Sequence, residues 1–221
     1  MVSIQAAGEQ ATSVRRASVD DVPAMAGVLA RAFHDDPAFT WVLRGDPCRL
    51  KILAGGFELF LRRIWMEQEE TYTTAGAVAV AAWELPDRWK VAVLTQLRLL
   101  PAMLRTFSRH LPRILRALMV LEGKHPREPH YYLAFIGVDP GWQGRGLGAS
   151  VIAPILERCD SEGMPAYLEA SSPRNRALYE RHGFAVTEEF ALGRGAPPQW
   201  RMWRAPRGAA GAEVDSQPAS D

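Results

Sequence analysis

The sequence predicts an α/β protein built on one mixed β-sheet with helices on both faces. Residues 131–138 (YYLAFIGV) are apolar at consecutive positions, as in a strand that is buried on both sides within a sheet. A predicted helix over 147–163 and a predicted strand over 166–170 follow it. A strand, a helix and a strand in this order form a right-handed crossover between parallel strands. The other predicted strands are mostly antiparallel, so the whole sheet is mixed.

The first third of the chain supplies two helices and three strands. Apolar residues recur at helical spacing over 20–34 and over 48–67, and both runs are amphipathic. Short strands are predicted at 14–17, 71–74 and 77–83, the last two as a hairpin. These elements therefore form the part of the sheet that precedes, along the chain, the strand–helix–strand unit over 131–170.

The second half of the chain carries a basic helical segment and the last elements of the sheet. Residues 88–121 form two helical pieces that are separated near Pro112. A helix over 173–182 ends at a glycine, which suits a left-handed C-cap. Two final strands are predicted at 186–190 and at about 200–204.

The length of the chain favours a single domain with an insertion. Its 221 residues suffice for one large domain, which we expect over 13–205. Within it, 88–125 is expected to be a helical insertion. Residues 1–12 and 206–221 are rich in small and polar residues, so a flexible N-terminus and a disordered C-terminal tail are expected.

Composition and charge argue against several classes of protein. The formal net charge is +1, so the field of the whole molecule selects no particular partner, and no nucleic acid is expected. Cys48 and Cys159 lie far apart without a C-x-x-C pair, which argues against a disulfide framework and against a metal site. The N-terminus lacks the pattern of a signal peptide, and no run reaches the ~18 apolar residues of a membrane span. We therefore expect a cytoplasmic protein.

The most informative run is a glycine-rich loop that precedes the helix over 147–163. It reads Gln143-Gly144-Arg145-Gly146-Leu147-Gly148. Successive backbone N–H groups at a helix N-terminus bind phosphate without a metal, and glycines let phosphate oxygens approach them closely. The Arg145 side chain can add a charge-assisted contact. The loop therefore predicts a pyrophosphate site.

Glycine-rich loops of different kinds are alternatives to this pyrophosphate site. A dinucleotide-binding fingerprint needs G-x-G-x-x-G, whereas these glycines fall at every second position. A Walker loop needs Gly-Lys-Ser/Thr, which is absent from this sequence. A plain glycine turn between a strand and a helix is the simplest alternative. The order of strand, loop and helix favours the phosphate site.

A second motif lies on the predicted helix over 173–182. Asn175 and Tyr179 are four residues apart, so they share one face of that helix. A tyrosine there could donate a proton to a departing thiolate. That step matters because the thiol product has an unperturbed pKa of about 8.5 and the phenol one of about 10. A buried aromatic residue with a satisfied hydroxyl is the alternative, and the glycine-rich loop favours the acid role.

Together the two motifs resemble the GCN5-related N-acetyltransferase (GNAT) superfamily. The Q/R-x-x-G-x-G/A loop of that family matches 143–148, and its Asn-x-x-x-Tyr helix with a terminal Gly-Phe matches 175–184. The resemblance covers roughly 14–204. It implies the GNAT fold, whose strand at 135–138 splays from its parallel neighbour, with acetyl-CoA as the co-substrate and no metal. The residues expected to bind acetyl-CoA are Ile136, Gly137, Val138, Gln143, Gly144, Arg145, Gly146, Leu147, Gly148, Asn175 and Tyr179.

Within the superfamily, the chain looks most like the small-molecule acetyltransferases of the puromycin N-acetyltransferase type. This likeness implies direct transfer of an acetyl group to the primary amine of a small molecule, antibiotic or aminonucleoside-like, in a ternary complex. A role in antibiotic resistance would follow. Two alternatives stay open, namely a protein or peptide N-acetyltransferase and a non-catalytic acyl-CoA-binding sensor. The exposed edge of a mixed sheet makes a homodimer plausible.

The attacking amine must lose a proton, so the reaction needs a base or a water chain. Glu169 is the first candidate, because its alternation with Tyr167 predicts that it faces the cleft. A carboxylate that is solvated or paired with a helix is the alternative. Asp35 or Asp36 is the second candidate, and Glu84 is the third.

The oxyanion that develops at the thioester needs a preorganised hydrogen-bond donor. The backbone N–H of Val138 is expected to supply it if the strand bulges at Gly137. Such a donor is worth ~3 kcal/mol of the barrier.

The segment 88–121 has no acidic residue and seven basic ones. We expect a lid whose apolar side covers the acceptor site, and prefer this to contact with an anionic membrane surface. Five aromatic side chains are candidates for lining an acceptor pocket, with plain core packing as the alternative: Phe33, Trp41, Trp83, Tyr131 and Tyr132.

Overall fold

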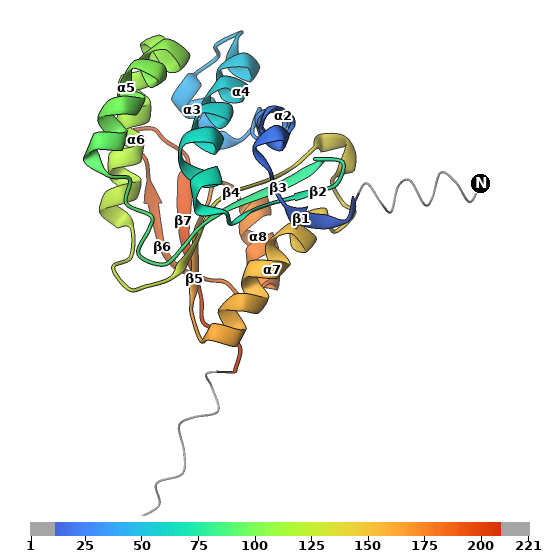
Figure 1. Ribbon diagram of the computed structural model, residues 1–221. Helices are drawn as coiled ribbons and strands as arrows, with labels where there is room; N and C mark the ends of the chain where they lie inside the picture. The colour runs from blue at the N-terminus through green and yellow to red at the C-terminus, as the bar shows by residue number, and fades with distance from the viewer. Residues whose placement is uncertain (1–11, 209–221) are drawn as a thin grey trace, which may run out of the picture.

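A seven-stranded sheet forms the centre of the computed structural model, which describes residues 12–208 (Figure 1). The strand order is β1-β2-β3-β4-β5-β7-β6. The strands are β1 (Val14–Arg16), β2 (Thr71–Thr74), β3 (Ala79–Glu84), β4 (Tyr131–Val138), β5 (Ala166–Ala170), β6 (Ala185–Ala191) and β7 (Pro198–Arg204). The pair β4 and β5 is parallel and the other pairs are antiparallel, so the predicted mixed sheet is confirmed. The expected loose ends, 1–12 and 206–221, lie almost wholly outside the described residues.

Helices cover both faces of this sheet. One face carries α2 (Val22–Ala32), α3 (Pro37–Leu43) and α4 (Arg49–Phe60), and the other carries α7 (Leu147–Glu162) and α8 (Pro173–Arg181). Short helical turns complete this set: η1 (Val19–Asp21), η2 (Leu61–Trp65), η3 (Met66–Gln68), η4 (Ser108–His110) and η5 (Pro140–Trp142). Strand β3 divides its side chains between the two cores: Ala81 packs on the side of α7, and Val80 and Ala82 pack under α2 and α4.

The helix α3 is an element that the sequence pattern does not predict. The expected break after α2 is present, but Asp36 caps a new helix there. Its Oδ1 atom accepts hydrogen bonds from the backbone N–H of Ala38 at 2.9 Å and of Phe39 at 3.3 Å. Pro37 occupies the first helical position, which tolerates proline. A helix of seven residues is too short to show a periodic apolar pattern.

The parallel strands β4 and β5 separate soon after they begin. Their pairing covers Tyr131 with Ala166 and Tyr132 with Tyr167, and no later pair is formed by the described residues. Strand β4 continues alongside β3 as far as Val138. The splay that the resemblance implies is therefore present, and it exposes one edge of β4.

The bulge expected at Gly137 is absent from that position. Gly137 pairs in register with Val80, and the irregularity in the ladder leaves Ala134 as the extra residue. Gly137 is instead a place of close helix packing. A Cβ atom there would lie 2.9 Å from the Leu29 Cδ2 atom and 3.1 Å from the Ala32 Cβ atom. The glycine therefore lets α2 approach the sheet.

The segment 88–125, which was expected to be an insertion, forms two helices, α5 (Val93–Phe107) and α6 (Leu111–Lys124), at the side of the molecule where β6 and β7 lie (Figure 1). Their inner residues Leu99, Met103 and Phe107 form a small core with side chains of α4. Large apolar residues also share the outer surface with the arginines, among them Leu97 and Met119, which are 61% and 71% exposed. The apolar side of the insertion is therefore only partly turned inward. None of the described helices is long and apolar enough to cross a membrane.

Candidate active site

The glycine-rich loop opens onto the N-terminus of α7. Gly144 and Gly146 both have φ +78, in the left-handed region that favours glycine. A Cβ atom at either position would meet nothing within 4 Å, so the space in front of the loop is open. Gly146 caps α7 without a side-chain hydrogen bond, and the first amides of the helix have no partner within it. This end of α7 can therefore receive an anion.

Gln143 and Arg145, two residues of the predicted site, differ in what their side chains contact. The Gln143 side chain donates a hydrogen bond to the Val138 carbonyl at 3.1 Å and accepts one from Arg174 at 3.1 Å. The Arg145 guanidinium lies 4.8 Å from the centre of the Trp142 ring and is exposed. Gln143 thus braces the loop against β4, whereas Arg145 stays available to an anion.

The backbone of β4 turns two amides toward the gap that the splay leaves. The Asp139 N–H donates to the Val78 carbonyl at 2.9 Å, which fixes which amides face β3. Because N–H groups alternate along a strand, those of Ile136 and Val138 point the other way, toward the side of β5. The Val138 amide thus reaches the gap without the bulge that was expected at Gly137.

The glycine-rich loop, β4 and α8 meet at Gly148. A Cβ atom there would lie 3.7 Å from the Ile136 side chain, 3.7 Å from the Val138 side chain and 4.0 Å from the Leu178 side chain. Leu178 precedes Tyr179 on α8. The residues predicted from two separate motifs are therefore brought to one place.

Tyr179 is a buried tyrosine that keeps its proton. Its side chain is 6% exposed, and its ring centre lies 6.1 Å from that of Phe184 in an edge-on arrangement. Burial raises the pKa of the Tyr179 phenol, and the nearby charge of Asp36 raises it further. No described residue forms a hydrogen bond with the hydroxyl, so the phenol proton is not shared with another side chain in the described structure.

Asp36 and Ser171 join α3 to the end of β5. The Ser171 hydroxyl donates a hydrogen bond to the Asp36 Oδ2 atom. Burial raises the pKa of the Asp36 carboxyl, and the hydrogen bond from Ser171 opposes this shift. Asp35 is exposed and pairs with Arg49 instead, so the two neighbouring candidates separate. The sequence assigned no role to Ser171, because no local pattern links it to α3.

Glu169 accepts hydrogen bonds from two tyrosines. The Tyr132 hydroxyl lies 2.8 Å from its Oε2 atom and the Tyr167 hydroxyl 2.7 Å from its Oε1 atom. Burial raises the pKa of the Glu169 carboxyl to about 7, although both hydrogen bonds favour the ionised form. A carboxyl that titrates near neutrality suits a proton acceptor.

Glu84 lies beside Glu169 and is a second buried carboxyl. It is 6% exposed, and the Trp65 indole donates a hydrogen bond to it at 3.0 Å. Burial raises the pKa of Glu84 to about 8, and the charge of Glu169 adds to the shift. Glu84 is therefore mostly protonated at neutral pH and is the weaker candidate for a base.

Two histidines that the sequence patterns did not single out border the Glu169 cluster. The His125 ring centre lies 3.8 Å from that of Trp89 and 4.8 Å from that of Tyr132. Its Nε2 atom is 3.0 Å from the Nε2 atom of His130. Burial lowers the pKa of His125 to about 3, so the ring is neutral. No sequence spacing connects these histidines with Glu169, since the chain between them passes through β4 and α7.

The predicted aromatic residues divide between the two faces of the sheet. Phe33 packs with Phe57 and Phe135, at ring-centre distances of 5.5 Å to each, on the face of α2 and α4. Trp83 and Tyr131 lie in the opposite core, under α7, which agrees with core packing and not with a pocket-lining position for these two. Strand alternation and the bulge at 134 decide which face each side chain takes.

Comparisons with known proteins agree with this geometry. A family model described as the acetyltransferase (GNAT) family matches residues 110–184. The chain is 28% identical over 225 residues to an uncharacterized N-acetyltransferase of Schizosaccharomyces pombe, a match that covers 93% of this chain and 88% of that protein. The chain is therefore similar to acetyltransferases of the GNAT family.

Solved structures show the GNAT fold as well. A crystal structure described as a histone acetyltransferase and related acetyltransferase from Corynebacterium glutamicum superposes with a TM-score of 0.65 at 24% identity, over 88% of this chain and 96% of that one. The polyamine N-acetyltransferase of Drosophila melanogaster superposes with a TM-score of 0.57 at 13% identity, over 87% and 99% of the two chains. The GNAT model spans α6, β4, the glycine-rich loop, α7, β5 and α8. GNAT enzymes use acetyl-CoA as their co-substrate.

Proposed function

We propose that the chain is a cytoplasmic N-acetyltransferase that transfers an acetyl group from acetyl-CoA to the primary amine of a small molecule. The observation that carries the proposal is the splay of β4 from β5, next to an uncapped helix N-terminus and a protonated tyrosine. The amides of Gly146, Leu147 and Gly148 would bind the pyrophosphate, with Arg145 adding a charge. The exposed edge of β4 at Ile136 and Val138 would hold the pantetheine arm, and Asn175 would line its path.

Three groups would carry the chemistry. Glu169 would take a proton from the amine, directly or through a water, as the nitrogen attacks the thioester carbon. The N–H of Val138 would hold the oxyanion of the tetrahedral intermediate. The C–S bond would then break, and Tyr179 would give its proton to the departing thiolate. The products are the N-acetyl amine and CoA, with each proton accounted for.

The acceptor in this proposal is a small molecule, antibiotic or aminonucleoside-like, as the likeness to the puromycin N-acetyltransferase type implies. The polyamine acetyltransferase among the similar structures supports a small amine. The insertion at 88–125 would act as a lid over the acceptor site and narrow the groove that a protein substrate needs. A role in antibiotic resistance would follow from such an acceptor.

An amine panel tests the proposal. Purified protein is incubated with acetyl-CoA and either small amines or peptides, and CoA release is followed with a thiol reagent. Release with small amines supports the proposal. Release with peptides alone would make the chain a protein acetyltransferase, and tight binding without release would make it an acyl-CoA sensor.

A further inference from the structure

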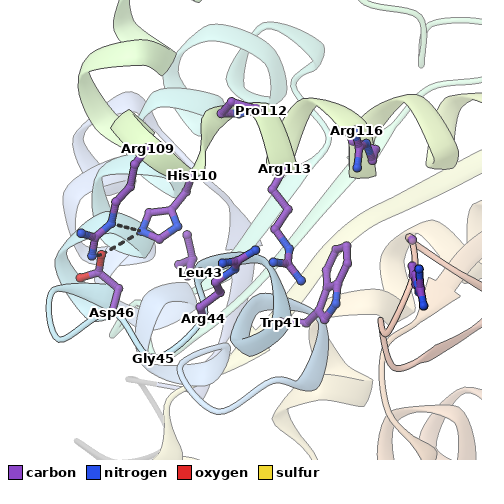
Figure 2. Close-up of a pocket in the computed structure, with 12 residues that line it drawn as sticks. Trp41, Leu43, Arg44, Gly45, Asp46, Arg109, His110, Pro112, Arg113 and Arg116 are labelled. Carbon is purple, nitrogen blue, oxygen red and sulfur yellow. Dashed lines mark hydrogen bonds and ion pairs between the residues drawn. The ribbon is translucent and has the colours of Figure 1, made fainter.

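A cationic cavity of about 810 Å³ lies between three segments that are far apart in the sequence (Figure 2). The end of α3, the start of α6 and the loop between β6 and β7 form its walls. Its charged lining consists of Arg44, Asp46, Arg109, His110, Arg113, Arg116 and Arg194. Five arginines thus face a cavity with a single carboxylate.

The single carboxylate of the cavity, that of Asp46, already has two partners in the protein. The Asp46 Oδ2 atom lies 2.6 Å from the Arg109 guanidinium and 2.8 Å from the His110 Nε2 atom. The other arginines of the cavity are Arg44, Arg113, Arg116 and Arg194, and none of them pairs with a carboxylate within residues 12–208. An excess of positive charge is therefore left without a counter-ion from the protein.

Arg113 shows most clearly that a partner is missing. Its guanidinium lies 3.8 Å from the centre of the Trp41 ring, and its buried Nε atom has no hydrogen-bond partner in the described structure. Figure 2 shows the Arg44 and Arg113 side chains extending toward one another beside Trp41. Burial lowers the pKa of Arg113, and the charges of Arg44 and Arg116 lower it further. An anion in the cavity would satisfy the free N–H and relieve this repulsion.

The loop between β6 and β7 is held at the cavity by the same tryptophan. A Cβ atom on Gly193 would lie 3.1 Å from the Trp41 ring, so the loop backbone packs directly on it. Gly193 has φ +158, and Arg194 follows it. This packing places the exposed Arg194 in the lining of the same cavity as Arg113.

The cavity is at the same end of the sheet as the candidate active site. Ala170 pairs with Trp200 and Ala191 with Pro198, so the loop between β6 and β7 lies at the C-terminal end of β5. Ser171 at this end holds Asp36, the cap of α3. The seven residues of α3 span about 10 Å from that cap to Leu43 in the cavity wall.

We propose that this cavity binds an anionic group, phosphate or carboxylate, of the acceptor, so that the substrate is an amine that also carries a negative charge. Calling the bound molecule an acceptor rests on the proposed acetyl transfer. The existence of the anion site does not depend on that proposal. The shape of the site favours a small molecule, because the arginines surround a cavity and not a flat surface. Bidentate guanidinium contacts suit phosphate and carboxylate equally.

Matched amines test the proposal. The protein is saturated with CoA, which occupies the glycine-rich loop, and is titrated by calorimetry with aminohexyl phosphate, aminoheptanoate or aminohexanol. The two anionic amines are expected to bind at least about tenfold more tightly than the alcohol. The same order is expected for kcat/KM with acetyl-CoA, and the two anionic probes show which group is preferred.

Variants assign the effect to the cavity. Arg113→Gln and the exposed-loop variant Arg194→Gln should each reduce the preference for the anionic amine about tenfold. Arg105→Gln, an exposed arginine on α5 outside the cavity, should leave it unchanged. Equal binding of the three probes, or an equal loss in the Arg105 variant, would overturn the proposal. Arginine-dependent binding without turnover of any probe would support the anion site and count against the acetyltransferase assignment alone.

Discussion

The Tyr132 hydroxyl donates a hydrogen bond to the Glu169 carboxylate at 2.8 Å, and this bond spans β4 and β5 at the point where they separate. Tyr132 and Tyr167 are the last parallel pair, and both reach the same carboxylate. Glu169 is thus held at the base of the splay, where burial raises its pKa to about 7. The splay that exposes the edge of β4 also positions the candidate base.

Activity should depend on the ionisation of Glu169. The ionised form accepts the proton, so kcat/KM is expected to rise with pH up to about 7 and to level off above it. Glu169→Gln should lower kcat by about 10²–10⁴-fold and remove this limb. Glu162, which accepts a hydrogen bond from Tyr131 at 2.8 Å under the opposite face, provides the control. The pH–rate profile of Glu162→Gln should match that of the parent. A similar loss of kcat in Glu169→Gln and in Glu162→Gln would contradict the assignment of Glu169 as the base.

The Tyr179 hydroxyl should matter for turnover and not for binding. Burial keeps the phenol protonated, so Tyr179→Phe removes a proton that is available for the thiolate. We expect a fall in kcat of at least about 10²-fold with little change in the Kd for CoA. The kinetics of CoA release measure kcat, and calorimetry measures the Kd for CoA. An unchanged kcat would remove Tyr179 from the mechanism.

Val138→Pro should abolish activity in a folded protein. The Val138 N–H points away from β3, so its loss removes the oxyanion donor without breaking the ladder between the two strands. A fall in kcat of about 10²-fold or more is expected, with a Tm close to that of the parent. Gly137→Pro is the matched comparison, because that N–H faces β3 and its loss should lower the Tm clearly. Parental rates for Val138→Pro would reject the role.

Gly146→Glu should prevent CoA binding. The glycine has φ +78, and the new carboxylate would also enter the space in front of α7. Gly163, with φ +65 at the other end of the same helix, offers a control with comparable backbone strain. Calorimetry should detect CoA binding by Gly163→Glu and none by Gly146→Glu. Equal binding by both would show that the loop does not hold the pyrophosphate.

Glu84 should make the fold less stable as the pH rises. Its pKa is raised to about 8 from 4.5, so the penalty of burying a charge is absent below about 4.5 and develops as pH rises toward 8. Glu84→Gln, which keeps an acceptor for the Trp65 indole, removes this penalty. The variant should have a Tm higher by at least about 4 °C at pH 9 and a Tm close to the parent at pH 5. Thermal unfolding of the parent and the variant at pH 5 and pH 9 measures this difference in Tm. An equal difference in Tm at the two pH values would contradict the prediction.

Much of the fold could be predicted because its signals are local. The buried strand at 131–138 and the helix after it follow from apolar runs and glycine punctuation within a few residues. The loop around Gly146 and the face shared by Asn175 and Tyr179 follow in the same way. The α3 helix could not be predicted, because seven residues are too few to show a period and its cap, Asp36, is equally typical of a break.

By itself, the sequence determined the order of the strands and of the helices other than α3, the glycine-rich loop and the helix that carries Tyr179, since hydrogen bonds and periodicity between near neighbours specify these. Tertiary structure alone decided that the bulge falls at Ala134, that Ser171 binds Asp36 and that Trp83 packs in the core under α7. It also decided that Arg44, Arg113 and Arg194 surround one cavity. Such contacts join residues that are tens to hundreds of positions apart, and only the packing of whole elements brings them within reach.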